Sequence, residues 1–143
     1  MAAYKNVVIA LELNEKNDQA IVDRAKNLCG NTNYFLIHAV EHLGNFGGAY
    51  GISAGFDVEE ILTKEAENAM NKSSQQFNIP KANCITKIGP AKFVILEEAE
   101  AVNADLIICG SHGRNGLRLL LGSTANAILH GAKCDVLAVR VSD

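Results

Sequence analysis

The residues best suited to chemistry lie between Cys109 and Leu129, where glycines, small hydroxyl side chains and a histidine follow a strongly apolar run. Glycine lets backbone N–H groups approach a ligand without an intervening Cβ atom. Residues 122–124 open a predicted helix, whose first N–H groups have no partner within the helix and favour a phosphate. The pattern therefore predicts an anion cradle made mostly of backbone, with tight turns and a capped helix as the simpler alternative.

His112 is the side chain of this loop that could act as an acid or a base beside phosphates. The loop has no recognisable nucleophile, no cluster of carboxylates for Mg²⁺ and no lysine for a γ-phosphate, which are the groups that phosphoryl transfer uses. There is no GxxxxGK[ST] motif, and no GxGxxG follows the first predicted strand. We therefore expect His112 to position a ligand rather than to catalyse, and we expect no efficient enzyme.

Composition and charge restrict the class of protein. The chain has 143 residues, of which 48% are hydrophobic and 20% charged, which is typical of one globular domain. Its net charge of −3, without a cluster of basic residues, argues against binding to nucleic acid or an anionic membrane. The apolar runs are too short to span a membrane and the first residues lack a signal-peptide pattern, so we expect a cytoplasmic protein.

The cysteines are scattered along the chain without a CxxC pair, which predicts reduced, buried thiols and no metal site. They are Cys29, Cys84, Cys109 and Cys134.

Strand-like and helix-like segments alternate along the chain and must position the glycine-rich motif. The predicted strands cover residues 5–13, 33–41, 82–88, 104–111 and 134–141. The predicted helices cover residues 15–28, with Asn14 as the cap, 57–77, 91–103 and 123–132. His38 falls inside a buried strand and is expected to be a satisfied core histidine. The alternation predicts a single doubly wound, Rossmann-like α/β domain over residues 1–143, with a five-stranded, mostly parallel sheet and helices on both faces.

Two segments between these elements bear on function. Residues 42–56 contain five glycines and no usable period, which predicts a mobile loop before a helix capped by Asp57. The motif at residues 110–113 follows the fourth strand directly. Since ligands of open parallel sheets bind beyond the carboxyl ends of the strands, where the winding reverses, we expect the ligand there.

The sequence resembles the universal stress protein family along its whole length. The resemblance rests on "GSHG" at 110–113, "GS" at 122–123, and the strands "VVIALEL", "FLIHAVE" and "CDVLAVRV". The nucleotide-binding branch of that family has the signature G-x-x-G, nine residues and G-[S/T]. Gly110, Gly113, Gly122 and Ser123 match it in type, but eight residues separate the two halves. That spacing is similar to the branch regarded as not binding ATP, which lacks these glycines.

The resemblance implies an adenine nucleotide, ATP or AMP, with Mg²⁺ possible alongside ATP. The implied binding residues are Ala10, Glu12, Ala39, Gly110, His112, Gly113, Gly122, Ser123 and Thr124. The binding branch usually has an aspartate where Glu12 stands, and a solvated loop carboxylate is the alternative for this residue.

The resemblance also implies a homodimer formed through the C-terminal strand, about Asp135 to Val141, unless the chain's own helices cover that strand. The predicted function is a stress-response protein that binds nucleotide as a sensor or switch without efficient catalysis. A dimeric interaction module that binds no nucleotide and a weak ATP hydrolase are the alternatives.

Overall fold

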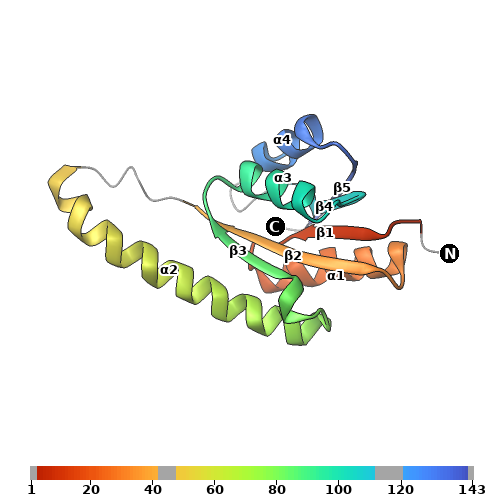
Figure 1. The fold of residues 1–143 in the computed structure, drawn as a ribbon, viewed down its shortest axis with the longest axis horizontal. Helices are drawn as coiled ribbons and strands as arrows, with labels where there is room; N and C mark the ends of the chain where they lie inside the picture. The colour runs from red at the N-terminus through yellow and green to blue at the C-terminus, as the bar shows by residue number, and fades with distance from the viewer. Residues whose placement is uncertain (1–2, 42–47, 112–120, 142–143) are drawn as a thin grey trace.

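Five parallel strands form one sheet in the computed structural model, which describes residues 3–41, 48–111 and 121–141 (Figure 1). The strands are β1 (Asn6–Ala10), β2 (Asn33–Val40), β3 (Cys84–Ile88), β4 (Leu106–Gly110) and β5 (Asp135–Val139). Their order is β3-β2-β1-β4-β5, and every neighbouring pair is parallel. The predicted α/β fold class is confirmed.

The central strand shows why the sheet is buried on both faces. Val7, Val8 and Ile9 of β1 are each 0% exposed, and their side chains alternate between two separate cores. Val7 and Ile9 pack with apolar residues of α1 (Glu15–Cys29) and α2 (Gly48–Phe77), whereas Val8 packs with those of α3 (Ala91–Ala101) and α4 (Ser123–Gly131). The winding therefore reverses between β1 and β4, which defines the edge where a ligand is expected.

Helix α2 begins earlier than the sequence predicted. It starts at Gly48, so the loop predicted for residues 42–56 is wrong from residue 48 onward, and Asp57 lies inside the helix rather than capping it. Residues 42–47 lie outside the described part of the chain. A helix that already exists gains one hydrogen bond for each residue added, and this gain offsets the roughly 1 kcal/mol by which each glycine disfavours helix. The first turns of α2 extend away from the sheet (Figure 1).

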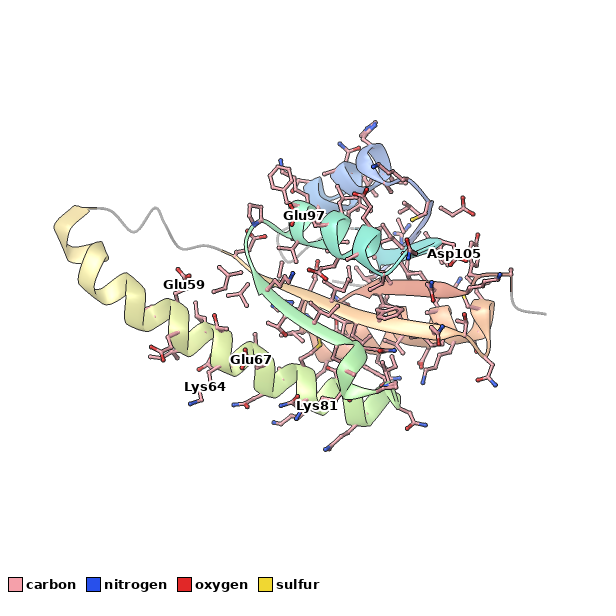
Figure 2. All side chains as sticks on the ribbon, in the orientation of Figure 1. Glu59, Lys64, Glu67, Lys81, Glu97 and Asp105 are labelled. Atoms are coloured by element: carbon pink, nitrogen blue, oxygen red, sulfur yellow. The ribbon has the colours of Figure 1, made fainter. Side chains whose placement is uncertain are left out.

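Polar side chains fix the ends of these elements. The side chain of Asn14 accepts a hydrogen bond from Asn17 N at 3.2 Å, as expected of the predicted cap of α1. The carboxylate of Asp105, just before β4, accepts hydrogen bonds from the backbone of Lys5 at 2.7 Å and Asn6 at 2.9 Å, which aligns the starts of β1 and β4 (Figure 2).

The charged side chains and the cysteines differ in how far they are exposed. Charged side chains such as Lys64 and Glu67 lie on the exposed surface of α2 (Figure 2). No helix among the described residues is long and apolar enough to cross a membrane. All four cysteines are free, but only Cys29 and Cys109 are buried, whereas Cys84 and Cys134 are half-buried.

Candidate functional site

A cleft of about 460 Å³ lies at the carboxyl ends of β1, β2 and β4. Small-molecule sites commonly have volumes in this range. The cleft brings together every predicted site residue that the structure describes: Ala10, Glu12, Ala39, Gly110, Gly122, Ser123 and Thr124. His112 and Gly113 lie outside the described residues.

Two backbone hydrogen bonds fix Ser111, and one of them joins the two halves of the glycine motif, residues 110–113 and 122–123. Ser111 N donates to Val139 O at 2.8 Å, and Gly122 N donates to Ser111 O at 2.8 Å. The second bond closes the connection between β4 and α4 and places the first turn of α4 beside the end of β4. The two halves of the motif, separated in sequence, therefore meet at one rim of the cleft.

The first turn of α4 carries the donors of the predicted anion cradle. Gly122 is the N-cap, and no side chain of the described residues caps this helix. The first hydrogen bond of the helix runs from Asn126 N to Gly122 O at 2.9 Å. The N–H groups of Ser123, Thr124 and Ala125 therefore precede the hydrogen-bonded part of the helix, and such groups suit an anion.

The floor of the cleft is small and apolar. Ala10, Ala39, Ile95 and Cys109 line it and are buried. Burial, with a smaller contribution from the negative charge of Glu12, raises the pKa of the Cys109 thiol to about 11. The thiol is therefore protonated at neutral pH and is a packing group rather than a nucleophile.

His38 has the hydrogen-bond partner that was predicted for it, but it lies at the cleft and not in the core. It is half-buried, lines the cleft, and its Nδ1 lies 2.7 Å from Leu11 O. Because a carbonyl oxygen only accepts, Nδ1 carries the hydrogen and donates it. The apolar run around His38 predicts an interior strand, although the position next to Ala39, near the carboxyl end of β2, also indicates the cleft.

Asp18 is a second residue that the sequence analysis missed. It lies in α1, is 3% exposed, and its Oδ1 accepts a hydrogen bond from Glu12 N at 3.3 Å. Burial raises the pKa of its carboxyl group to about 6, opposed by hydrogen bonds from backbone N–H groups that include that of Glu12. The β1–α1 loop that carries Glu12 to the cleft is thus held by a buried carboxyl group.

The cleft lining contains two carboxylate side chains. These are Glu12 and Glu41, and Glu41 also accepts a hydrogen bond from Ala91 N at 3.1 Å. The described parts of the chain contain no group of three or more His, Cys, Asp or Glu residues that could hold a metal ion. The described lining also contains no lysine or arginine.

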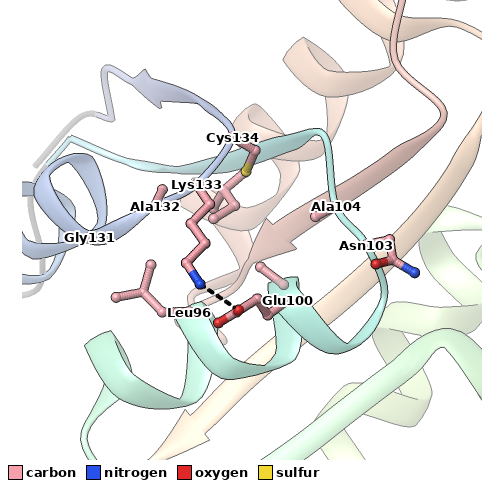
Figure 3. Close-up of a pocket in the computed structure, with 10 residues that line it drawn as sticks. Leu96, Glu100, Asn103, Ala104, Gly131, Ala132, Lys133 and Cys134 are labelled. Atoms are coloured by element: carbon pink, nitrogen blue, oxygen red, sulfur yellow. Dashed lines mark hydrogen bonds and ion pairs between the residues drawn. The ribbon is translucent and has the colours of Figure 1, made fainter.

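A cavity of about 270 Å³ lies between the C-terminal ends of α3 and α4 (Figure 3). The ion pair between Lys133 Nζ and Glu100 Oε1, 2.8 Å apart, crosses it and is well exposed. Exposed pairs of this kind contribute little energy. Cys134 is half-buried in this cavity. The basic residue among the described lining residues is Lys133, and it is paired with Glu100. This cavity therefore holds no comparable set of ligand-binding groups.

Comparison with known proteins identifies relatives along the whole chain. A model of the Universal stress protein family matches residues 3–140. The chain is 54% identical over 143 residues to Universal stress protein A homolog 2 of Coxiella burnetii, covering 99% of this chain and 98% of that protein. Among solved structures, hypothetical protein MJ0577 superposes with a TM-score of 0.82 at 21% identity, covering 98% of each chain. A universal stress protein in complex with cAMP superposes with a TM-score of 0.59 at 24% identity, covering 99% of this chain and 100% of that one.

Proposed function

The chain belongs to the universal stress protein family, and we propose from this premise that it is a cytoplasmic stress-response protein that binds ATP or AMP in the cleft between β1, β2 and β4. The observation that carries the proposal is the hydrogen bond from Gly122 N to Ser111 O. It brings the first turn of α4 to the rim of a cleft whose floor is apolar. A phosphate and a flat base need these two environments side by side.

The dimensions and chemistry of the cleft suit a nucleoside phosphate. The short side chains of Ala10 and Ala39 leave room for a planar base against the ends of β1 and β2. The N–H groups at the start of α4 suit the phosphates. Glu12, at the cleft, suits a ribose hydroxyl, which would donate a hydrogen bond to its carboxylate. A solved member of the family that shares this fold is in complex with cAMP.

Mg²⁺ bound together with ATP would not need a preformed cage of protein ligands. The ion usually keeps several waters and binds one or two carboxylates plus the phosphates of its substrate. Glu12 is assigned to the ribose, so Glu41 is the carboxylate of the described lining that remains for the ion.

A sensor or switch fits the cleft better than an efficient enzyme. Phosphoryl transfer depends on positioned cations and on a group that orients the nucleophile. The described lining has no cationic side chain, and its cysteine is a protonated thiol. These groups can hold a nucleotide but offer little stabilisation of a transition state.

The test is thermal unfolding of nucleotide-stripped protein at increasing ATP or AMP. A ligand that binds only the folded state adds about 2.7 kcal/mol at a hundred times its dissociation constant, so binding raises the melting temperature in a saturating manner. Gly122→Val fits the local backbone, φ −61° and ψ 154°, but adds bulk at the rim, and it should abolish the rise. Asn126→Val, on the exposed side of the same helix, is the matched control and should keep it.

No shift at millimolar nucleotide would contradict the proposal and favour the alternative of an interaction module without a nucleotide. Equal shifts in the wild type and in Gly122→Val would place the nucleotide elsewhere on the protein.

We also propose that β5 forms a homodimer interface. In the described residues, β5 pairs only with β4, so the backbone groups along its other edge have no strand beside them. The strand is mostly apolar there, with half-buried Val136, Leu137 and Ala138. An unpaired, mostly apolar edge strand is a template for pairing with a second chain.

A further inference from the structure

One peptide group at the cleft is held from both sides by side chains. The C=O of Leu11 and the N–H of Glu12 belong to the same peptide unit. His38 Nδ1 donates to that C=O at 2.7 Å, and Asp18 Oδ1 accepts from that N–H at 3.3 Å. The two side chains come from different elements, β2 and α1, so the contact between these elements fixes the orientation of this peptide.

The orientation of this peptide determines where Glu12 points. Leu11 N donates to Ile37 O at 2.9 Å, which continues the pairing of β1 with β2 up to this point. Leu13 follows with φ of 62°, in the left-handed region that side chains other than glycine seldom adopt. The loop must therefore turn sharply between a fixed strand and the cap of α1. A strained turn of this kind persists only where its surroundings hold it in place.

We propose that Asp18 and His38 are positioning residues that direct Glu12 into the cleft, and that protonation of Asp18 loosens this hold so that nucleotide binds more weakly in mild acid. This inference rests on the proposed function.

The chemistry of the carboxyl group gives the direction of the effect. An ionised carboxylate only accepts hydrogen bonds, whereas a protonated one carries an O–H donor. Backbone N–H groups of Glu12, Leu13 and Asn14 all donate toward Asp18, so a proton there meets donors rather than acceptors. Protonation of His38, in contrast, leaves its Nδ1–H in place. We call Asp18 and His38, which hold the Leu11–Glu12 peptide from its two sides, the clamp. The acid-sensitive residue of the clamp is therefore Asp18.

The charged groups around the clamp agree with this assignment. Glu12 faces Asp18 and disfavours its charge. Glu15 of α1 and two residues of α2, Glu65 and Lys72, line the cavity of about 280 Å³ that Asp18 borders. Lys72 is the cation among these described groups. At the cleft, His38 shares the lining with Glu12 and Glu41.

The first experiment follows the Glu12 amide by ¹⁵N-resolved NMR without nucleotide, from about pH 8 down to about pH 4.5. The wild-type amide should shift with a midpoint close to that of the Asp18 carboxyl. Asp18→Asn keeps the size and one acceptor oxygen but cannot titrate, and it should abolish this transition. Asp23→Asn, the same change at an exposed position of α1, should retain it.

His38 is tested by two replacements. The side-chain nitrogen of asparagine is as many bonds from Cα as Nδ1, so His38→Asn should retain the Glu12 amide position, whereas His38→Leu should displace it at all pH values. A Glu12 amide that does not titrate in the wild type, or that titrates equally in Asp18→Asn, would overturn the clamp.

The second experiment measures ATP affinity of the wild type and of Asp18→Asn over the same pH range. The phosphates of ATP titrate in this range too, but the ratio of the two dissociation constants cancels that effect. The dissociation constant of the wild type divided by that of Asp18→Asn should rise about fivefold from neutral pH to mild acid. A factor of this size is typical of weak coupling between two sites. A constant ratio would overturn the inference while leaving the proposed function standing. Absence of ATP binding at every pH would remove the proposed function, and the Glu12 titration would still decide the clamp.

Discussion

Replacing Asp18 by asparagine should stabilise the protein at neutral pH by an amount that disappears in acid. The carboxyl group has an ordinary pKa of 3.8, which burial raises to about 6 in the folded protein. The folded state therefore binds the proton more tightly than the unfolded chain. Well below pH 3.8 both states are protonated and the burial has no electrostatic cost, whereas well above pH 6 the folded state carries the full cost.

The size of the effect follows from the two pKa values. A tenfold change in proton affinity corresponds to about 1.4 kcal/mol, so a rise from 3.8 to about 6 corresponds to about 3 kcal/mol at neutral pH. Asparagine has nearly the same shape and no charge. Any change that the amide itself causes in the fold is the same at every pH. The difference in unfolding free energy between variant and wild type should therefore grow by about 3 kcal/mol between acid and neutral pH.

Urea unfolding at several pH values between about 3 and about 7.5 measures this growth directly. Asp23→Asn provides the control, since Asp23 is exposed on the same helix and accepts a hydrogen bond from Gln19 at 2.8 Å. A pH-independent difference would refute the assignment of a raised pKa. A variant that becomes less stable than the wild type as pH rises would show that the backbone hydrogen bonds to Asp18 outweigh its burial.

Three further predictions address the rest of the molecule. Ala138→Pro should convert the proposed dimer to a monomer in light scattering. Val139 O faces β4, and successive residues of a strand face opposite edges, so the N–H of Ala138 faces the edge of β5 away from β4. A dimer that survives this change would exclude this edge as the interface. The Cys109 thiol should react with a thiol reagent far more slowly in the folded than in the unfolded protein, since it is 3% exposed and its pKa is raised; equal rates would contradict its burial. Asp105→Ala should lower the unfolding free energy by about 1–3 kcal/mol in urea titrations, because the backbone N–H groups of Lys5 and Asn6 lose a charged acceptor; an unchanged midpoint would show that water replaces it.

The strands and most helices could be predicted because the local pattern and the tertiary environment agree. The uninterrupted apolar run at Val7, Val8 and Ile9 is buried on both faces, and Asn14 caps α1 as its side chain predicts. The start of α2 could not be predicted in the same way. Glycines between residues 44 and 55 disfavour helix locally, whereas growth from an established helix depends on the residues that follow.

The candidate site was predictable where it depends on topology and not where it depends on packing. Gly110 and Gly122 come together because one follows a strand and the other starts the next helix at the same edge. Asp18 was missed because an acidic residue near the start of a helix is ordinary, as it favours the positive end of the helix dipole. Only the packing of α1 against α2 and the loop makes it a buried carboxyl group.

The buried carboxylate links the stability of the fold to the geometry of the cleft. The charge that destabilises the folded state at neutral pH is also the acceptor that orients the Leu11–Glu12 peptide. Asp18→Asn should therefore separate two properties, with higher stability at neutral pH and nucleotide affinity that no longer follows the protonation of residue 18. Asp18→Leu removes the acceptor as well as the charge, so it should lose the Glu12 amide position at all pH values. If both variants bound ATP equally well at every pH, the carboxyl group would affect only the stability of the fold, and residues elsewhere would have to position Glu12.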